Sequence, residues 1–208
     1  MSRVRVFIDY QNVFHGAQDA FFDPALGRPH PTEGHVYPLA LAEHLVDLGK
    51  SHDAERVLDH VTVYKGMPTE KSHPKAQSAS ARQKATWQTQ SKVTATTRPL
   101  RYQADGYVNG RPKWKAGEKG IDVLLALDLA IGARDGLFDV GIVVSADTDL
   151  VPAMEVAMKA GVKVESAVWS GPYGRGRGLH HSCSGTWTHT LDQGAFAKVK
   201  DTTDYTIA

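Results

Sequence analysis

The chain has 208 residues, of which 41% are hydrophobic and 8% aromatic, and its 24 Lys and Arg nearly balance its 23 Asp and Glu, for a net charge of +1. This composition is typical of globular proteins and excludes a disordered polymer or a fibre. The single cysteine excludes an internal disulfide and a zinc site built on cysteine pairs, and no apolar run reaches the length of a secretion signal or a membrane span. We therefore expect a cytoplasmic protein with no membrane partner.

The first half of the chain predicts alternating strands, helices and loops. A β-branched and aromatic run over residues 4–9 predicts a buried strand that opens into a polar loop at residues 9–12. Glycines and prolines between residues 15 and 35 predict a long irregular segment. The remaining elements are a helix over residues 37–49, a strand over 57–64, an exposed helix over 74–91, a strand over 93–102 and a hairpin that turns at Asn109 and Gly110.

The second half predicts a parallel sheet. Residues 118–134 form a helix with apolar side chains nearly all round, which we expect to be buried on more than one side. A strand, a helix and a strand follow over residues 139–145, 150–160 and 162–169. Because both strands are continuous apolar runs joined by a helix, they predict parallel pairing with crossover helices. Beyond residue 169 the pattern is weak, apart from a glycine-rich segment over residues 171–178.

The near-neutral net charge conceals an uneven distribution. Residues 65–119 carry a net charge of +9, and the rest of the chain carries −8. Such a basic stretch could dock an anionic partner, and it could equally be a solvated surface that keeps the protein in solution. Charge alone does not decide between the two.

Two predicted strands end in acidic residues. Asp9 ends the first strand, and Asp147 and Asp149 follow the strand over residues 139–145. Neighbouring strands lie about 4.8 Å apart, so Asp9 and Asp147 would face one small ion if these two strands are neighbours. Asp122 stands in the first turn of the apolar helix, and a cluster of oxygen ligands favours Mg²⁺ or Mn²⁺. Taken singly, each acid also fits a cap or a turn, and Asp149 could cap the helix that follows it.

Three blocks of the sequence carry a family resemblance. They are Phe7-Ile8-Asp9-Tyr10-Gln11-Asn12, Lys119-Gly120-Ile121-Asp122-Val123-Leu124-Leu125-Ala126-Leu127-Asp128 and Val143-Val144-Ser145-Ala146-Asp147-Thr148-Asp149-Leu150-Val151-Pro152. In this order and spacing the chain resembles the NYN domain family, PIN-like nucleases that include the LabA-like proteins. The resemblance implies an α/β fold, namely a three-layer α/β/α PIN-like sandwich around a central, mainly parallel five-stranded sheet of order 3-2-1-4-5. It also implies metal-dependent ribonuclease activity.

The resemblance carries roles over to individual residues. It implies that the acidic site for Mg²⁺ or Mn²⁺ consists of Asp9, Asp122, Asp147 and Asp149, and that the catalytic residues are these four acids together with Asn12 and Lys119. It places Asn12 beside this site, where it would position the substrate or a metal-bound water. Lys119 would contact the scissile phosphate.

Three further positions bear on the implied site. Asp128 also matches a family position, but six residues along a helix place it about 120° away from Asp122. Ala146 and Thr148 stand where the family commonly has two glycines. These replacements leave the acids intact and alter how closely the loop can approach a phosphate.

The resemblance gives the basic stretch a partner, because RNA phosphates attract cations. The cations that we expect to contact RNA are Lys113, Lys115, Lys119, Arg175 and Arg177. Unpaired bases could stack on aromatic residues within the basic stretch, which are Trp87, Tyr102, Tyr107 and Trp114. Core packing is the alternative for these rings, favoured for Tyr102 and evenly balanced for Trp114. The two arginines suit a flexible surface loop equally well.

The sequence as a whole favours a metal-dependent endoribonuclease that acts on single-stranded or loop regions of RNA, with DNA cleavage as a near variant. The alternative is a non-cleaving RNA-binding or regulatory module that retains the fold, and a phosphatase is a third, weaker hypothesis. We expect residues 1–170 to form the nuclease domain and residues 171–208 to form a Gly/Arg loop and C-terminal extension that packs on it. The sequence leaves a homodimer open.

Overall fold

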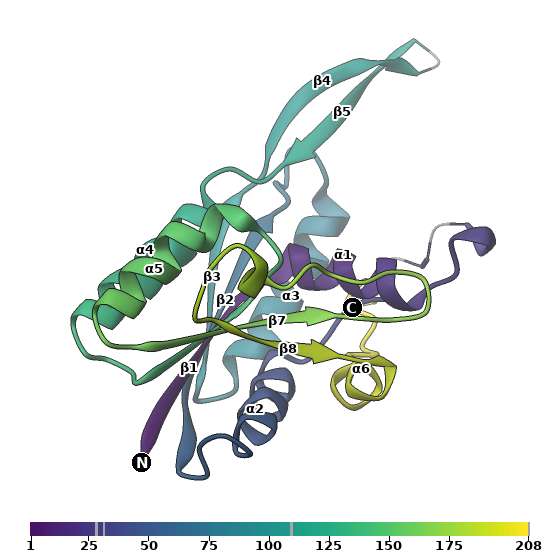
Figure 1. Cartoon of the computed structure of the whole chain (residues 1–208). Coiled ribbons are helices and arrows are strands. Elements are labelled where there is room, and N and C mark those ends of the chain that lie inside the picture. The colour runs from purple at the N-terminus through teal and green to yellow at the C-terminus, as the bar shows by residue number, and fades with distance from the viewer. Residues whose placement is uncertain (28, 31, 109, 208) are drawn as a thin grey trace.

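The computed structural model describes residues 1–27, 29–30, 32–108 and 110–207, without the side chains of residues 108 and 111–113 (Figure 1). The strands are β1 (Ser2–Asp9), β2 (Arg56–Met67), β3 (Val93–Pro99), β4 (Arg101–Val108), β5 (Arg111–Gly117), β6 (Val140–Val144), β7 (Lys163–Trp169) and β8 (Trp187–Leu191). The helices are α1 (Tyr10–Phe21), α2 (Pro38–Gly49), α3 (Pro74–Gln88), α4 (Ile121–Arg134), α5 (Val151–Lys159) and α6 (Gln193–Val199). Short 3₁₀ turns are η1 (Pro24–Leu26), η2 (Thr148–Leu150) and η3 (Leu179–His181). Among the described helices, none combines the length and apolar character needed to cross a membrane.

The central sheet has six strands in the described part of the chain, all parallel, in the order β3-β2-β1-β6-β7-β8. The five-stranded prediction is therefore wrong by one strand. The first five strands follow the implied order, and β8 extends the sheet beyond β7. The sequence pattern misses β8 because it is a short edge strand whose buried side chains include His189 as well as Leu191. The division of the chain at residue 170 stays a prediction.

The sheet separates two apolar cores, which confirms a layered α/β architecture. Val4, Val6 and Ile8 of β1 point into the core covered by α1, α2, α3 and α6. Phe7 points to the opposite face, which α4 and α5 cover. Figure 1 shows α4 and α5 lying side by side on that face. Because β1 and β6 are buried on both faces, their residues form the continuous apolar runs seen in the sequence.

Helix α1 occupies residues for which the sequence predicts a polar loop and an irregular segment. Asp9 caps the helix, since its Oδ1 accepts the N–H of Asn12 at 3.1 Å. A buried stripe then faces the sheet, formed by Val13, Ala17 and Ala20. The predicted irregularity is wrong up to residue 21, because the cap and this apolar stripe outweigh the low helix propensity of Gly16.

Helix α4 exposes an apolar stripe. Val123, Leu127 and Ile131 are 58%, 49% and 43% exposed, while the side of the helix that carries Leu125 and Leu129 is buried. The prediction that this helix is buried on more than one side holds where α4 faces the sheet and α5, and it fails for this outer stripe. Only one side of α4 contacts the sheet, and the residues at every fourth position on its outer side remain in solvent.

Strands β4 and β5 form an antiparallel hairpin that projects from the body of the molecule (Figure 1). The strand predicted over residues 93–102 is thus two strands, β3 and the start of β4. Tyr102 anchors the base of the hairpin, because its ring stacks on His73 with centroids 5.2 Å apart. Further out, Tyr107 and Trp114 are 78% and 54% exposed. Trp87 is buried in the core instead. Core packing is therefore the correct interpretation for Trp87 and the wrong one for Trp114.

A buried ion pair joins β2 to β7. Arg56 donates two hydrogen bonds to Glu165, with Nη2 2.9 Å from Oε1 and Nη1 3.1 Å from Oε2. His189 Nε2 lies 2.8 Å from the same Oε2, so β8 completes the cluster. Gly49 makes room for it, because a Cβ there would overlap the Arg56 guanidinium. This cluster ties the last strand of the sheet to the N-terminal half of the chain.

Candidate functional site

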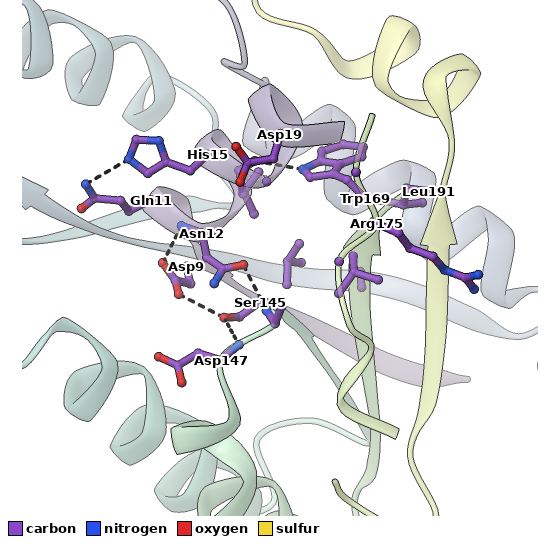
Figure 2. A pocket seen from close by; sticks show the side chains of 18 of the residues that line it. Asp9, Gln11, Asn12, His15, Asp19, Ser145, Asp147, Trp169, Arg175 and Leu191 are labelled. Atoms are coloured by element: carbon purple, nitrogen blue, oxygen red, sulfur yellow. Dashed lines mark hydrogen bonds between the residues drawn. The ribbon is translucent and has the colours of Figure 1, made fainter. Parts of the chain in front are cut away.

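The carboxyl ends of β1 and β6 open into a cavity of about 660 Å³, which we call the acidic cavity. Ile8 pairs with Val144, so the residues that follow them emerge side by side at this edge of the sheet. The acids that line the cavity are Asp9, Asp19, Glu118, Asp122 and Asp147. Figure 2 shows Ser145 linking the carboxylate of Asp9, at the start of α1, to the backbone N–H of Asp147 in the loop after β6. Three of the four predicted metal ligands therefore lie around one cavity.

A chain of hydrogen bonds fixes the two loops of this edge to each other. Ser145 Oγ donates to Oδ2 of Asp9 at 3.0 Å and accepts the N–H of Asp147 at 3.1 Å. Asn12 Oδ1 accepts the N–H of Ala146 at 3.0 Å. The carboxylate of Asp9 is therefore held on both sides, by the first turn of α1 and by the loop after β6.

Two acids that match the family blocks lie elsewhere. Asp149 is exposed and is not among the described residues that line the acidic cavity, although its N–H donates to Oδ1 of Asp147 at 2.9 Å. The carboxylate of Asp128 accepts a hydrogen bond from the Tyr64 hydroxyl at 2.7 Å and is likewise absent from the lining. Asp149 is thus a neighbour of the cavity, and Asp128 belongs to a separate contact between α4 and β2.

Sequence reasoning missed Glu118. Its carboxylate accepts the N–H of Gly66 at the end of β2 and contributes to the acidic cavity. Gly120 follows with φ of 76°, a left-handed conformation that suits glycine, and turns the chain into α4 so that Glu118 and Asp122 reach the same cavity. The available signal was its position, since Glu118 directly precedes the block that contains Asp122.

Burial and mutual repulsion favour the protonated form of the carboxyl groups in this cavity. Burial raises the pKa of Asp9 to about 6; the N–H of Asn12 and the hydroxyl of Ser145 oppose this shift, and the charges of Asp122 and Asp147 add to it. Burial also raises the pKa of Asp122, with smaller contributions from the charges of Asp147 and Asp149. The cavity therefore concentrates negative charge that a cation would relieve.

The pKa of Glu118 is raised as well. Burial raises its pKa to about 7, the N–H of Gly66 opposes the shift, and the charges of Asp9 and Asp122 increase it. The neighbouring Lys65 is half-buried, and desolvation lowers its pKa to about 8. Glu118 and Lys65 can therefore both exchange protons near neutral pH.

The donor set fits a hard divalent cation. Among the described residues, no three carboxylate, imidazole or thiolate groups are close enough to form a ready cage around one ion. Mg²⁺ and Mn²⁺ do not require such a cage, because Mg²⁺ in particular binds through one or two carboxylates and retains several waters. Asp9, Asp122 and Asp147 could supply those carboxylates, with Glu118 beside them.

The predicted RNA contacts separate into two regions. Arg175 lines the acidic cavity, and Arg177 lines a groove next to it. Lys115 is exposed on β5, and Lys119 is exposed between the hairpin and α4 but is not among the described residues that line the cavity. The side chain of Lys113 lies outside the described part of the structure.

Comparison with known proteins gives one family and one structural neighbour of note. The chain is similar to the crystal structure of a protein of unknown function from Vibrio parahaemolyticus, with 16% sequence identity, a TM-score of 0.49 and coverage of 90% of this chain and 92% of the other. A search of curated proteins gives no match. The NYN domain matches residues 3–183, which include all three sequence blocks and the acids of the cavity. The chain belongs to the NYN domain family.

Proposed function

We propose that this protein is a metal-dependent endoribonuclease that hydrolyses RNA phosphodiester bonds at the acidic cavity. NYN domains are generally nucleases, so membership of the family indicates a nucleic-acid substrate. The observation that carries the finer proposal is the convergence of Asp9, Asp122 and Asp147, which are far apart in sequence, on one cavity. When bound there, Mg²⁺ or Mn²⁺ supplies a water of lowered pKa and stabilises the charge that develops on the phosphate.

Each residue of the acidic cavity then has a separate role in the proposed reaction. Asp122 and Asp147 hold the cation, and Asp9 presents a carboxylate that its hydrogen bonds to Asn12 and Ser145 keep in place. Arg175, at the same cavity, neutralises the phosphate that the acids would otherwise repel. Asn12 lines the cavity and keeps its proposed role in positioning the substrate. Asp149 and Lys119, which are not among the described lining residues, keep their proposed roles in metal binding and phosphate contact.

The hairpin supports RNA as the substrate. Residues 101–117 of the hairpin include four basic residues and one acid. The hairpin ends at Gly117, directly before Glu118 of the acidic cavity. Tyr107 and Trp114 are exposed on it, and a lone two-stranded ribbon is only marginally stable in water. A strand of RNA that enters the cavity would cover these rings by base stacking and pair its phosphates with Lys113 and Lys115.

The proposal is tested by incubating a mixed pool of structured and unstructured RNA with the purified chain and Mn²⁺, with Mg²⁺, and with a chelator, and then mapping the ends. We expect internal cuts in unpaired regions with either metal and none in chelator. A DNA strand of the same sequence separates ribonuclease from general nuclease activity. No cleavage with any divalent metal, together with RNA binding that persists in chelator, would instead support the non-cleaving RNA-binding or regulatory module, which Ala146 and Thr148 in the altered loop favour.

Metal affinity should depend on pH. Because the pKa of Asp9 is raised to about 6 and that of Glu118 to about 7, protons compete with the cation in acid, and affinity rises as pH increases through this range. We expect Mn²⁺ affinity to fall by up to roughly tenfold per pH unit for each proton that the cation displaces, which is one proton between about pH 6 and 7 and two protons below about pH 6. Calorimetric titration between pH 5 and pH 8 measures this, and Asp9→Asn should flatten the curve. An affinity independent of pH over the whole range would contradict the assignment.

Trp114 should contribute to RNA binding. Stacking of one base on an aromatic ring is worth about 1–3 kcal/mol, so Trp114→Ala should weaken binding of a single-stranded RNA oligonucleotide roughly five- to 150-fold. Trp114→Phe is the matched control, because it keeps an aromatic face and should retain most of the affinity. Fluorescence anisotropy in chelator gives both values. If Trp114→Ala and the unmodified chain bind the oligonucleotide equally well, Trp114 does not contact the RNA.

A further inference from the structure

A second cavity of about 470 Å³ adjoins the acidic cavity, and we call it the basic groove. The two share Val168, Arg175 and Gly176 in their linings. The polar side chains of the groove are Arg175, Arg177, His180, His181, Thr188 and Thr190. Among the described residues that line the groove there is no carboxylate, whereas five line the acidic cavity. The electrostatic character of the lining therefore reverses from one cavity to the next.

The glycine-rich segment builds the groove by close packing. The N–H of Gly176 donates to the carbonyl of Trp169 at 2.8 Å, and a Cβ on Gly176 would lie 2.9 Å from the Cβ of Val168. Leu179 in the following turn is 1% exposed and anchors that turn in the core. The two arginines therefore extend from a backbone that is packed against β7, and the flexible-loop alternative is not needed to explain them.

The basic side chains of the groove lie close together. The rings of His180 and His181 have centroids 3.9 Å apart. The charge of His180 lowers the pKa of His181, and slight burial, Arg177 and Arg175 lower it further. Thr188 Oγ1 lies 2.7 Å from Nδ1 of His180 and 2.6 Å from Oγ of Ser166, so this hydroxyl holds the His180 ring in place. An anion that entered would relieve this repulsion and meet several hydrogen-bond donors.

We propose that the basic groove is a phosphate-binding subsite for the nucleic-acid strand that the acidic cavity cuts. The inference rests on the proposed function and extends it to the path of the strand. Arg175 lines both cavities, so a strand whose scissile phosphate lies among the acids can place another phosphate in the groove without leaving the protein surface. Arginine matches phosphate oxygens with paired N–H donors, which suits Arg175 and Arg177 to this role.

The group that the basic groove would bind is a phosphoryl group with at least two free oxygens. Two parts of a nucleic-acid strand carry such a group. It can be an internal phosphodiester of the strand or a phosphate at one of its ends. The experiment separates them with three RNA oligonucleotides of one sequence, which carry a 5′-phosphate, a 3′-phosphate or hydroxyls at both ends. Affinities are measured in chelator, so that binding is read without cleavage.

Arg177→Ala is the test variant because its side chain is exposed and the groove backbone does not depend on it. We expect it to lose roughly tenfold or more in affinity, as for removal of a hydrogen bond to a charged group. Arg177→Lys should recover part of the loss, and Lys50→Ala, which removes an exposed cation that pairs with Asp47 outside both cavities, should leave affinity unchanged. A loss confined to one phosphorylated end assigns a terminal phosphate, and an equal loss for all three oligonucleotides assigns an internal one.

Inorganic phosphate gives a second reading that does not involve RNA. Titration followed through the ring signals of His180 and His181 by nuclear magnetic resonance should show a saturable shift that Arg177→Ala weakens. The inference is overturned if Arg177→Ala binds all three oligonucleotides as the unmodified chain does, or if phosphate leaves both ring signals in place. If Arg177→Ala weakens binding while the unmodified chain fails to cut RNA with Mn²⁺, the result supports the basic groove as a phosphate-binding site and contradicts the proposed ribonuclease activity. If the unmodified chain cuts RNA and Arg177→Ala binds and cuts it equally well, the ribonuclease activity stands and the groove lies outside the path of the strand.

Discussion

Replacing Asp147 with Asn is expected to lower metal-dependent RNA cleavage at least about a hundredfold, because a bound cation supplies several kcal/mol of charge stabilisation and each 1.4 kcal/mol corresponds to tenfold in rate. Asp147 suits this test better than Asp9, which also caps α1 and accepts the hydroxyl of Ser145. In Asp147→Asn the amide oxygen can still accept the N–H of Asp149, so the loop after β6 should keep its shape. Initial rates with Mn²⁺ on one RNA substrate provide the measurement.

The matched control for this substitution is Asp128→Asn. It makes the same chemical change on an acid of the same sequence blocks, but Asp128 contacts Tyr64 and does not belong to the described lining of the acidic cavity. We expect its cleavage rate to remain within about twofold of the unmodified chain, since the amide oxygen can still accept the Tyr64 hydroxyl. Undiminished cleavage by Asp147→Asn would remove this residue from the metal site, and a large loss in Asp128→Asn would require a site that extends along α4.

Replacing Glu165 with Gln should cause a large loss of stability. The change leaves the Arg56 guanidinium buried without its counter-charge, and breaking a buried pair in this way costs about 3–5 kcal/mol. For a chain of this size that corresponds to a fall in Tm of roughly 6–20 °C. Thermal and denaturant unfolding at pH 7 measure it. Asp47→Asn, which alters an exposed pair with Lys50, should change stability by no more than about 1 kcal/mol.

The Arg56–Glu165 pair also predicts how the difference in stability between Glu165→Gln and the unmodified chain varies with pH. Burial would raise the pKa of Glu165, but hydrogen bonds from His189 and Arg56 outweigh burial and hold it below its ordinary value of 4.5. A carboxylate with a lowered pKa stabilises the folded state above the unfolded pKa and loses that contribution as pH falls through the folded pKa. The gap between Glu165→Gln and the unmodified chain should therefore be full at pH 7 and narrow below pH 4.5. A gap that stays constant down to pH 3 would show that the lost stability does not come from the charge of Glu165.

The parallel sheet and the placement of three acids follow from sequence because both depend on patterns that are local. The runs that end at Asp9 and near Asp147 are apolar throughout, as strands buried on both faces must be, and strand ends of a parallel sheet share one edge. Asp122 joins them through the family block. Glu118 could not be found in this way, because its place in the cavity depends on the turn at Gly120 and on a contact with β2, which no periodicity reveals.

The errors have a common physical origin in tertiary contacts. The pattern of α4 is apolar all round, yet its outer stripe, which includes Val123, is exposed because only one side meets the sheet. β8 carries His189 on its buried side, where the hydrogen bond to Glu165 makes a polar residue acceptable in the interior. Both features depend on neighbours that are distant in sequence, so residue type alone gives the wrong burial.

The position of β1 between β2 and β6 also governs when activity can arise during synthesis. β1 is synthesised before β6, which is one of its two partners, and Ser145, which holds Asp9, lies 136 residues further along the chain. Pairings of such sequence separation form late and slowly. A nascent chain that has not yet exposed the loop after β6 therefore lacks the acidic cavity. If the proposed activity holds, an unfinished polypeptide cannot cut the messenger that is still encoding it.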